Sequence, residues 1–175
     1  KHFFDIGANN GSTFDRFLLK TNEFDGARIW CFEPSPRCWP ELIAEADELS
    51  HRFKITLCPF GLDGKFGTFH FYQQHETEGD TFISDPVDFK GNPARPANFK
   101  HEMVAPQIPI SAFIKQHTSA DDKITLKLDC EGSEYAILDD LLKHDSALVR
   151  CEKIMVEWHW VRSINHRQER ERLEI

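Results

Sequence analysis

The chain has 175 residues, of which 40% are hydrophobic and 29% are charged, so it can bury the core of one globular domain. Its net charge of -8 argues against a nucleic-acid backbone or an anionic membrane as the main partner and suits a cationic small molecule better. No apolar run reaches the roughly 18 residues of a membrane-spanning helix, so we expect a soluble domain without a membrane segment.

The N-terminal part of the chain predicts a strand, a helix and a second strand. Residues 2–7 (HFFDIG) and 28–33 (RIWCFE) are apolar runs of strand length. Between them, an i, i+3, i+4 spacing predicts a helix that Ser12 or Thr13 caps, with an apolar face made of Phe14, Phe17 and Leu18.

A second helix and a third strand follow. Ser35 is the expected cap and Pro36 the first helical residue, with apolar positions at Leu42, Ile43, Ala46 and Leu49. Residues 54–62 (KITLCPFGL) predict the third strand. The alternating residues 68–72 (TFHFY), after an Asp63-Gly64 turn, predict a small hairpin.

The last elements repeat the alternation of strand and helix. Residues 123–129 (KITLKLD) predict a fourth core strand and residues 152–160 (EKIMVEWHW) a fifth. The helix between them carries an apolar stripe of Tyr135, Leu138, Leu141 and Leu142. Continuous apolar strands alternating with helices predict an α/β class, a Rossmann-like doubly wound and mainly parallel sheet.

One segment, residues 73–107, interrupts this pattern and predicts a long loop, either a lid or a disordered insertion. It shows no sustained period and contains Pro86, Pro93, Pro96, Pro106, Gly79 and Gly91. Polar groups that could reach an acceptor, or simply face solvent, are His75, Asp80, Thr81, Arg95, Lys100 and His101. We treat residues 1–175 as a single domain. Because Lys1 lies almost directly inside a strand, we expect this domain to belong to a longer chain.

The five cysteines are an odd number without a C-x-x-C pair, which suggests neither a disulfide framework nor a cysteine zinc site. We expect buried thiols in a reducing compartment, and hence a cytoplasmic location. The cysteines are Cys31, Cys38, Cys58, Cys130 and Cys151.

Residues 5–11 (DIGANNG) form the first strand-to-helix turn, where doubly wound sheets bind ligands. Its Asp5-x-Gly7-x-x-x-Gly11 spacing differs from the G-x-G-x-x-G of dinucleotide sites, so a nucleoside without a phosphate fits better. Gly7 would permit the tight turn and Gly11 a close approach of the helix to the ligand. Glu33, at the end of the second strand, would accept hydrogen bonds from ribose hydroxyls. The alternative is that the two glycines only turn the chain.

Four segments resemble, in order and spacing, the FkbM family of S-adenosylmethionine-dependent methyltransferases: DIGANNGSTF (5–14), CFEPSP (31–36), LKLDCEGSEYAIL (126–138) and VEWH (156–159). The resemblance implies a class I methyltransferase fold with the strand order 3-2-1-4-5, S-adenosylmethionine over the first strand, and transfer usually to an alcohol oxygen, often on a sugar or polyketide. It also implies where the donor lies, with its amino-acid end along the first turn, its ribose at Glu33 and its adenine near Gly61 and Leu62. The complete predicted donor site is Asp5, Gly7, Ala8, Asn9, Gly11, Ser12, Thr13, Glu33, Pro34, Gly61, Leu62 and Asp129.

The chain departs from the complete class I sheet, which has two further strands after the fifth. Residues 162–175 (RSINHRQERERLEI) predict a charged, helix-like tail instead, so the sheet is expected to lack its last strands. Further domains or an oligomer would then cover the apolar edge of the fifth strand.

Methyl transfer to a hydroxyl needs a base, and five candidates follow the fourth and fifth strands: Asp129, Glu131, Glu134, Glu157 and His159. Asp129, His159, Glu131 and Glu157 are the predicted catalytic residues, with Asp129 or His159 as the base. Glu157 and His159 are two apart and so share a strand face. Alternatively, Glu131 and Glu134 only complement a helix dipole, and His159 only ends a strand between two tryptophans.

The same acids could hold Mg²⁺ or Mn²⁺, although the sequence does not require a metal and we assign no metal ligand. The expected partner is a small-molecule or glycan hydroxyl, on which Trp158 and Trp160 could stack if they are not core residues.

Two other functions stay open. A nicotinamide or flavin oxidoreductase would need the absent G-x-G-x-x-G motif, and a non-catalytic scaffold would keep only the fold.

Overall fold

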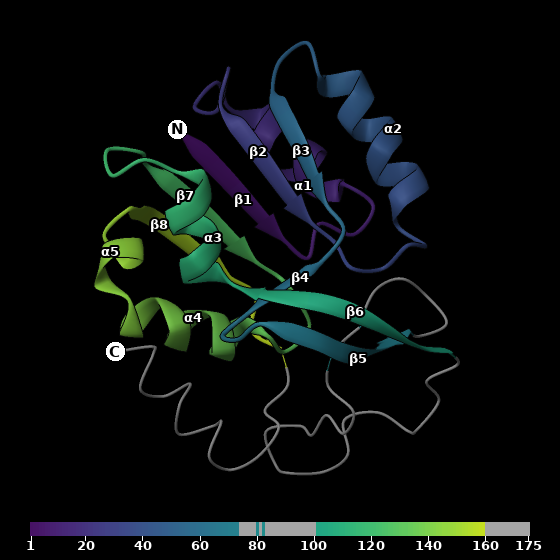
Figure 1. The fold of residues 1–175 in the computed structure, drawn as a ribbon. Coiled ribbons are helices and arrows are strands. Elements are labelled where there is room, and N and C mark those ends of the chain that lie inside the picture. The colour runs from purple at the N-terminus through teal and green to yellow at the C-terminus, as the bar shows by residue number, and fades with distance from the viewer. Residues whose placement is uncertain (74–79, 81, 83–100, 160–175) are drawn as a thin grey trace.

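The computed structural model describes residues 1–73, 80, 82 and 101–159. Its centre is a five-stranded parallel sheet with the order β3-β2-β1-β7-β8 (Figure 1). The strands are β1 His2–Ile6, β2 Arg28–Phe32, β3 Lys54–Cys58, β7 Ile124–Leu128 and β8 Cys151–Val156. This order confirms the predicted 3-2-1-4-5 arrangement and the α/β, Rossmann-like fold class.

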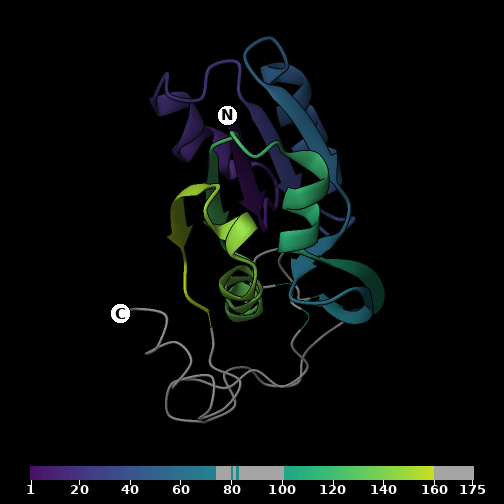
Figure 2. The same cartoon turned by 60° about the vertical axis from the view of Figure 1, so that its left-hand side comes forward.

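Alternate residues of the central strands face opposite sides of the sheet, and each side has its own apolar core. Phe3 and Ile29 belong to the core that packs against α1 Ser12–Arg16, the 3-10 helix η1 Leu18–Lys20 and α2 Trp39–Leu49. Phe4 and Trp30 belong to the core that packs against α3 Ile110–His117, α4 Glu134–Lys143 and α5 Asp145–Leu148. The rotated view shows β8, the yellow-green strand, at one margin of the sheet (Figure 2).

Both predicted helix caps were wrong. Gly11, in the left-handed conformation, is the N-cap of α1, and Ser12 and Thr13 are already helical. The second helix begins only at Trp39, with Cys38 as its N-cap and a proline in its first turn. Ser35 does not cap a helix, because its N–H donates to Glu33 and its hydroxyl to Asp80.

The predicted third strand is two strands in two sheets. β3 ends at Cys58, and β4 Gly61–Asp63 starts a second sheet with the order β4-β6-β5. The expected hairpin at 68–72 was therefore wrong. β5 Gly67–Gln73 does not pair with β4, because β6 His101–Pro109 lies between them, parallel to β4 and antiparallel to β5.

The expected loop 73–107 is also partly strand, since its two ends belong to β5 and β6. The alternation that marks β6 is present, with Ala105 and Gln107 buried and Val104 and Pro106 exposed, but Pro106 hid it from a reading of the sequence. The predicted polar residues His75, Thr81, Arg95 and Lys100, the side chain of His101 and the predicted lid lie outside the described residues.

The helix α3 was missed, although Ile110, Phe113 and Ile114 are buried at i, i+3 and i+4. In α4, Tyr135 and Leu141 of the predicted stripe are buried and Leu138 is half-buried against the core, but the prediction was wrong for Leu142 and missed Ile137. Ile137 is buried, whereas Leu142 is 48% exposed, as is Ile43 of α2 at 45%. These differences leave the placement of the helices on the sheet unchanged.

β8 ends at Val156, before the predicted limit of residue 160, and is the last strand of the sheet within the described part of the chain. Trp160 and the tail 162–175 lie outside it, so the absence of further strands and a partner at the β8 edge stay predictions. Among the described residues, no helix has the length and apolar character needed to cross a bilayer.

Candidate active site

A cavity of about 230 Å³ lies beyond the carboxyl ends of β1, β2 and β7 and beside the segment that follows β8. Most of the predicted site residues line it, namely Gly7, Asn9, Ser12, Glu33, Pro34, Gly61, Leu62, Asp129, Glu131, Glu157 and His159. Four predicted donor residues, Asp5, Ala8, Gly11 and Thr13, are buried but do not line it. The sequence thus located the cavity but not every residue on its wall.

The turn after β1 is held against two neighbouring strands. The N–H groups of Gly7 and Ala8 both donate to the carbonyl of Phe32, at 3.0 and 3.1 Å. Gly7 has a φ of +81°, and a Cβ there would lie 1.8 Å from the carbonyl oxygen of Asp129. Gly7 is therefore required for the close approach of two backbone segments that both border the cavity.

Gly11 has a different role from the one predicted. A Cβ at Gly11 would lie 3.3 Å from side-chain atoms of Glu45 and Phe14, and Gly11 is not on the cavity wall. Its φ of +94° forms the entry to α1. In this structure Gly11 serves helix entry and packing, whereas Gly7 and Asn9 are the residues of the 5–11 turn that line the cavity.

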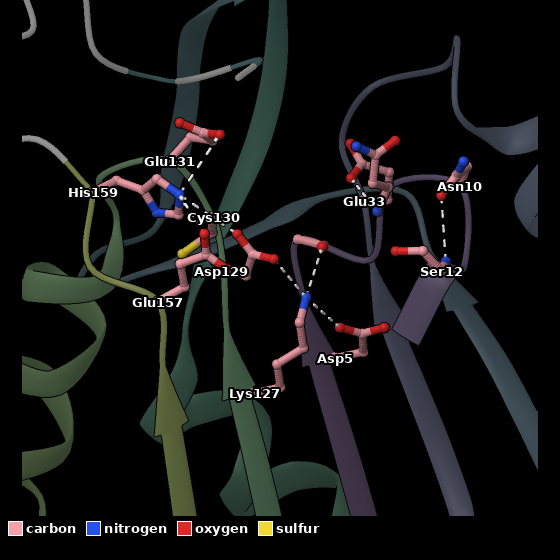
Figure 3. Close-up of polar contacts among 12 residues, drawn as sticks. Asp5, Asn10, Ser12, Glu33, Lys127, Asp129, Cys130, Glu131, Glu157 and His159 are labelled. Atoms are coloured by element: carbon pink, nitrogen blue, oxygen red, sulfur yellow. Dashed lines mark hydrogen bonds and ion pairs between the residues drawn. The ribbon is translucent and has the colours of Figure 1, made fainter. Parts of the chain in front are cut away.

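Glu33 lies at the end of β2 with both carboxylate oxygens bound to backbone (Figure 3). Oε2 accepts the N–H of Asn9 at 2.9 Å, and Oε1 accepts the N–H of Ser35 at 2.7 Å. Burial raises the pKa of Glu33 to about 7, although these two hydrogen bonds favour the charged form. A carboxylate can accept about four hydrogen bonds, so its orientation is fixed while capacity for ligand hydroxyls remains.

Lys127 is a site residue that the sequence reading missed. Its ammonium lies 3.2 Å from Asp5 Oδ1 and 3.0 Å from Asp129 Oδ2, and it donates to the Gly7 carbonyl at 3.4 Å (Figure 3). Burial alone would lower the pKa of Lys127, but the two carboxylates raise it above its usual value. The sequence feature that could have identified Lys127 is its position inside the apolar run of β7, where a buried charge without a partner would cost free energy.

Asp5 lies beneath the cavity rather than on its wall. It is 1% exposed, and burial raises the pKa of its carboxyl although Lys127 opposes the rise. Asp5 therefore holds Lys127 in place, and any effect on a ligand passes through Lys127 and the turn.

His159 brings together the acids that follow β7 and β8. Its Nδ1 lies 2.9 Å from Glu134 Oε1. Its Nε2 lies 3.6 Å from Asp129, 3.7 Å from Glu131 and 3.9 Å from Glu157 (Figure 3). Burial lowers the pKa of His159, but Glu134, Glu131 and Asp129 together raise it to about 9. The imidazole is therefore protonated at neutral pH, a state that cannot accept a proton.

Glu134 is not among the acids on the cavity wall. Its carboxylate accepts the N–H groups of Cys130 at 2.9 Å and Gly132 at 2.8 Å, in the turn before α4. Glu134 therefore has a local role at the start of α4, as the alternative interpretation of the sequence proposed, and it also orients His159.

Glu157 and His159 lie beyond the end of β8, so strand alternation does not explain why they converge. The N–H of Glu157 donates to the Leu128 carbonyl at 2.8 Å, which keeps this segment beside β7. Trp158 packs against Tyr135 of α4, with ring centroids 5.2 Å apart, and is not on the cavity wall.

Part of the cavity wall is apolar. Leu62 and Gly61 lie there with Phe71 and Phe82, whose ring centroids are 4.8 Å apart. Asp80 joins this part to the Glu33 turn, because it accepts the Ser35 hydroxyl at 2.8 Å and pairs with Arg37 at 2.5 Å. The cavity wall therefore has an apolar part, a carboxylate at the end of β2 and an acidic cluster after β7 and β8.

A parallel sheet of this order, with its cavity at the carboxyl ends of the strands, defines a Rossmann-like fold of the methyltransferase type. The family model described as the methyltransferase FkbM domain matches residues 5–172. The chain belongs to this family, and it is a methyltransferase. Comparison with curated proteins and with solved structures gives no significant match for the chain.

Proposed function

We propose that the protein is an S-adenosylmethionine-dependent O-methyltransferase, acting on a hydroxyl of a sugar, a glycan or a polyketide-like acceptor. The observation that carries the proposal is the cavity itself, which has Glu33 at the end of β2 and Asp129 at the end of β7 on its wall, in a domain of this family. Membership of the family supports methyl transfer, and the residues on the cavity wall support S-adenosylmethionine as the donor.

The residues fit the donor by their chemistry. The Glu33 carboxylate suits the two hydroxyls of a ribose, and the apolar part of the wall near Leu62 and Phe82 suits an adenine ring. The turn of Gly7 and Asn9 would border the amino-acid end. When bound, S-adenosylmethionine supplies an electrophilic methyl group on a positively charged sulfur, and the carboxylates of the wall are compatible with that charge.

Asp129 is the residue that we propose as the base for the acceptor hydroxyl. It lies on the cavity wall, and Lys127 at 3.0 Å holds one of its carboxylate oxygens. His159, the other candidate, has a pKa raised to about 9 and so carries a proton at neutral pH. In this assignment the acceptor's proton passes to Asp129, and His159 orients the neighbouring acids.

Thermal unfolding in parallel with S-adenosylhomocysteine, S-adenosylmethionine and NAD tests donor binding. At a hundred times the dissociation constant, a specific ligand adds about 2.7 kcal/mol, or roughly 5–10 °C in midpoint. We expect this shift with the first two ligands only, and its loss in Glu33→Ala. Glu23→Ala, which changes an exposed acid outside the cavity, should keep the shift. A shift with NAD alone would contradict the proposal.

A hydroxyl acceptor is tested by screening glycans and polyketide-like alcohols against amine analogues, with detection of the transferred methyl group by mass spectrometry. Methylation of the alcohols, lost in Asp129→Asn while donor binding is retained, is the expected outcome. A non-catalytic scaffold would predict donor binding without turnover on any acceptor. A scaffold would be favoured if Asp129, Glu157 and His159 were salt-bridged away from the cavity, whereas all three line it.

The setting in which the enzyme works is also a proposal. All five cysteines are free thiols, and Cys31, Cys38 and Cys58 are buried. Free thiols persist in reducing compartments, which supports a cytoplasmic location.

A further inference from the structure

The side chains that follow β7 and β8 form a compact set of possible metal ligands. Asp129, Glu157 and His159 each offer one ligand atom, and these atoms all lie within 4.8 Å of one another. We propose that these three residues bind one divalent cation of the Mg²⁺ or Mn²⁺ class, with Glu131 beside them. Carboxylate oxygens suit both ions, and a single imidazole is compatible with Mn²⁺ in particular.

His159 is oriented as a metal ligand would be, and a cation bound at Nε2 would displace the proton that the imidazole otherwise carries at neutral pH. Glu134, with 0% of its side chain exposed, lies 2.9 Å from Nδ1 and is itself held by two backbone N–H groups. This contact directs Nε2 towards Asp129, Glu131 and Glu157. A carboxylate on the far nitrogen of a histidine is the arrangement that fixes the tautomer and the ring plane in metal sites.

The separations around Nε2 fit a shared cation better than direct hydrogen bonds. The distances of 3.6, 3.7 and 3.9 Å to the three carboxylates exceed the range of a hydrogen bond. Two atoms that each lie about 2.1 Å from one cation are roughly 3–4 Å apart, depending on the angle between them. The side chains therefore need only small movements to coordinate an ion.

The two oxygens of Asp129 have separate partners. Oδ2 lies 3.0 Å from the Lys127 ammonium, whereas Oδ1 is the atom nearest to His159. Lys127 thus holds the carboxylate so that its other oxygen faces the cluster. Asp129 would in this way connect Lys127, and through it the turn after β1, to the cation.

The balance of charge around the cluster also favours a cation. Asp5, Asp129, Glu131, Glu134 and Glu157 gather about the ammonium of Lys127 and the ring of His159. Carboxylates in such excess repel one another, most strongly where they are shielded from water. A bound dication removes much of the free-energy cost of this repulsion. Glu157 is 69% exposed, so the cluster is open to the cavity on one side.

The use of the cation rests on the proposed function. A divalent cation at the acidic part of the cavity wall would bind the acceptor oxygen, lower the pKa of its hydroxyl and hold it near Asp129. The acceptor class would then be one whose hydroxyl, with a neighbouring oxygen, can ligate the metal, as a vicinal diol of a sugar does.

Titration of the chelator-treated protein with Mn²⁺ alone, followed by calorimetry and by the electron paramagnetic resonance signal of free Mn²⁺, tests the site without donor or acceptor. We expect one equivalent to bind with a dissociation constant below about 1 mM. Asp129→Asn, Glu157→Gln and His159→Gln should each weaken binding at least about tenfold. Glu152→Gln, which changes an exposed acid, and Asp139→Asn, which changes a half-buried one, both away from the cavity, should leave it unchanged.

Two results would overturn the proposal: no saturable binding, or binding that Glu157→Gln leaves intact. Glu157 is largely exposed, so this variant is expected to fold, and circular dichroism checks that it does. Donor binding is measured separately, as the thermal shift with S-adenosylhomocysteine in the presence of chelator. A donor shift without Mn²⁺ binding overturns only the metal site, whereas Mn²⁺ binding without a donor shift overturns only the donor proposal.

Discussion

At the scale of single residues, Gly7 and Gly26 differ in what surrounds them. Both have a positive φ, +81° and +72°. A Cβ on Gly7 would lie 1.8 Å from the Asp129 carbonyl oxygen, whereas a Cβ on Gly26 would have no atom within 4 Å. Alanine substitutions at these two glycines therefore distinguish two effects on the free energy of unfolding. One is a Cβ on left-handed backbone, and the other is a clash between two backbone segments.

We predict that Gly26→Ala lowers the free energy of unfolding by about 1–2 kcal/mol, the ordinary cost of a Cβ in the left-handed region. Gly7→Ala should cost at least about 2 kcal/mol more, because the turn and the segment after β7 must move apart. Urea denaturation of both variants measures the difference. Equal losses would show that the close approach at Gly7 does not matter for stability.

Glu33 gives a prediction about pH. Burial raises its pKa from 4.5 to about 7, so the folded state holds a proton that the unfolded state has released. The contribution of Glu33 to stability is therefore fully present below about pH 4.5 and is lost as the pH rises through 7, by an amount on the order of 3 kcal/mol.

Glu33→Gln removes this titration. We expect the free energy of unfolding of the native protein, minus that of Glu33→Gln, to fall between pH 5 and pH 8. The difference is measured by urea denaturation at each pH, with Glu152→Gln, an exposed acid, as the control whose difference stays flat. Parallel pH profiles for the native protein and Glu33→Gln would contradict the raised pKa.

At the scale of elements, the carboxyl ends of β1 and β7 are joined by backbone and by charge. The N–H of Asp129 donates to the carbonyl of Ile6 at 3.0 Å. Lys127, on β7, pairs with Asp5 on β1 and reaches the Gly7 carbonyl just beyond it. The turn after β1 is thus supported from the neighbouring strand.

We predict that Lys127→Met destabilises the protein by about 3 kcal/mol, because it leaves the buried Asp5 beside Asp129 without a cation. Lys143→Met removes an exposed pair with Asp139 within α4 and should cost less than about 0.5 kcal/mol. Chemical denaturation measures both.

The double variant Lys127→Met with Asp5→Asn tests the pairing itself. Its loss of stability should be smaller than the sum of the two single losses by at least about 1 kcal/mol. Additive losses would mean that Lys127 stabilises the fold by packing and not by compensating Asp5.

At the scale of the whole molecule, an aromatic cluster joins α3 to the centre of the large sheet. The ring of Phe113 lies 5.7 Å from Phe4, 5.1 Å from Trp30 and 4.9 Å from Phe32, measured between centroids. Phe4 comes from β1 and the other two rings come from β2, and the segments that follow these two strands line the cavity.

We predict that Phe113→Ala lowers stability by about 3–5 kcal/mol, because it opens a cavity among these rings. For a domain of this size the melting temperature should fall by roughly 6–20 °C. Phe66→Ala, at a position that is 69% exposed, should change it by less than about 2 °C. Scanning calorimetry compares the two variants, and similar small shifts would contradict the central role of this cluster.

The sequence by itself determined the parallel α/β class of the large sheet and the place of the cavity. Runs such as HFFDI and RIWCF carry apolar residues on both faces, and strands of this kind form parallel sheets covered by helices. Because parallel strands end at the same edge, Asp129, Glu33 and the DIGANNG turn could be placed around one cavity from their positions in the chain. The FkbM resemblance added the reaction class, which the family match bears out.

The tertiary structure alone decided the contacts between residues far apart in the chain. Lys127 and Gly7 are 120 positions apart, and no local pattern shows that they meet. The same is true of β6, which enters between β4 and β5, and of His159, whose ring is turned by Glu134 of α4. Periodicity and capping depend on near neighbours, whereas pairing, protonation and ligand geometry depend on which distant groups share a buried space.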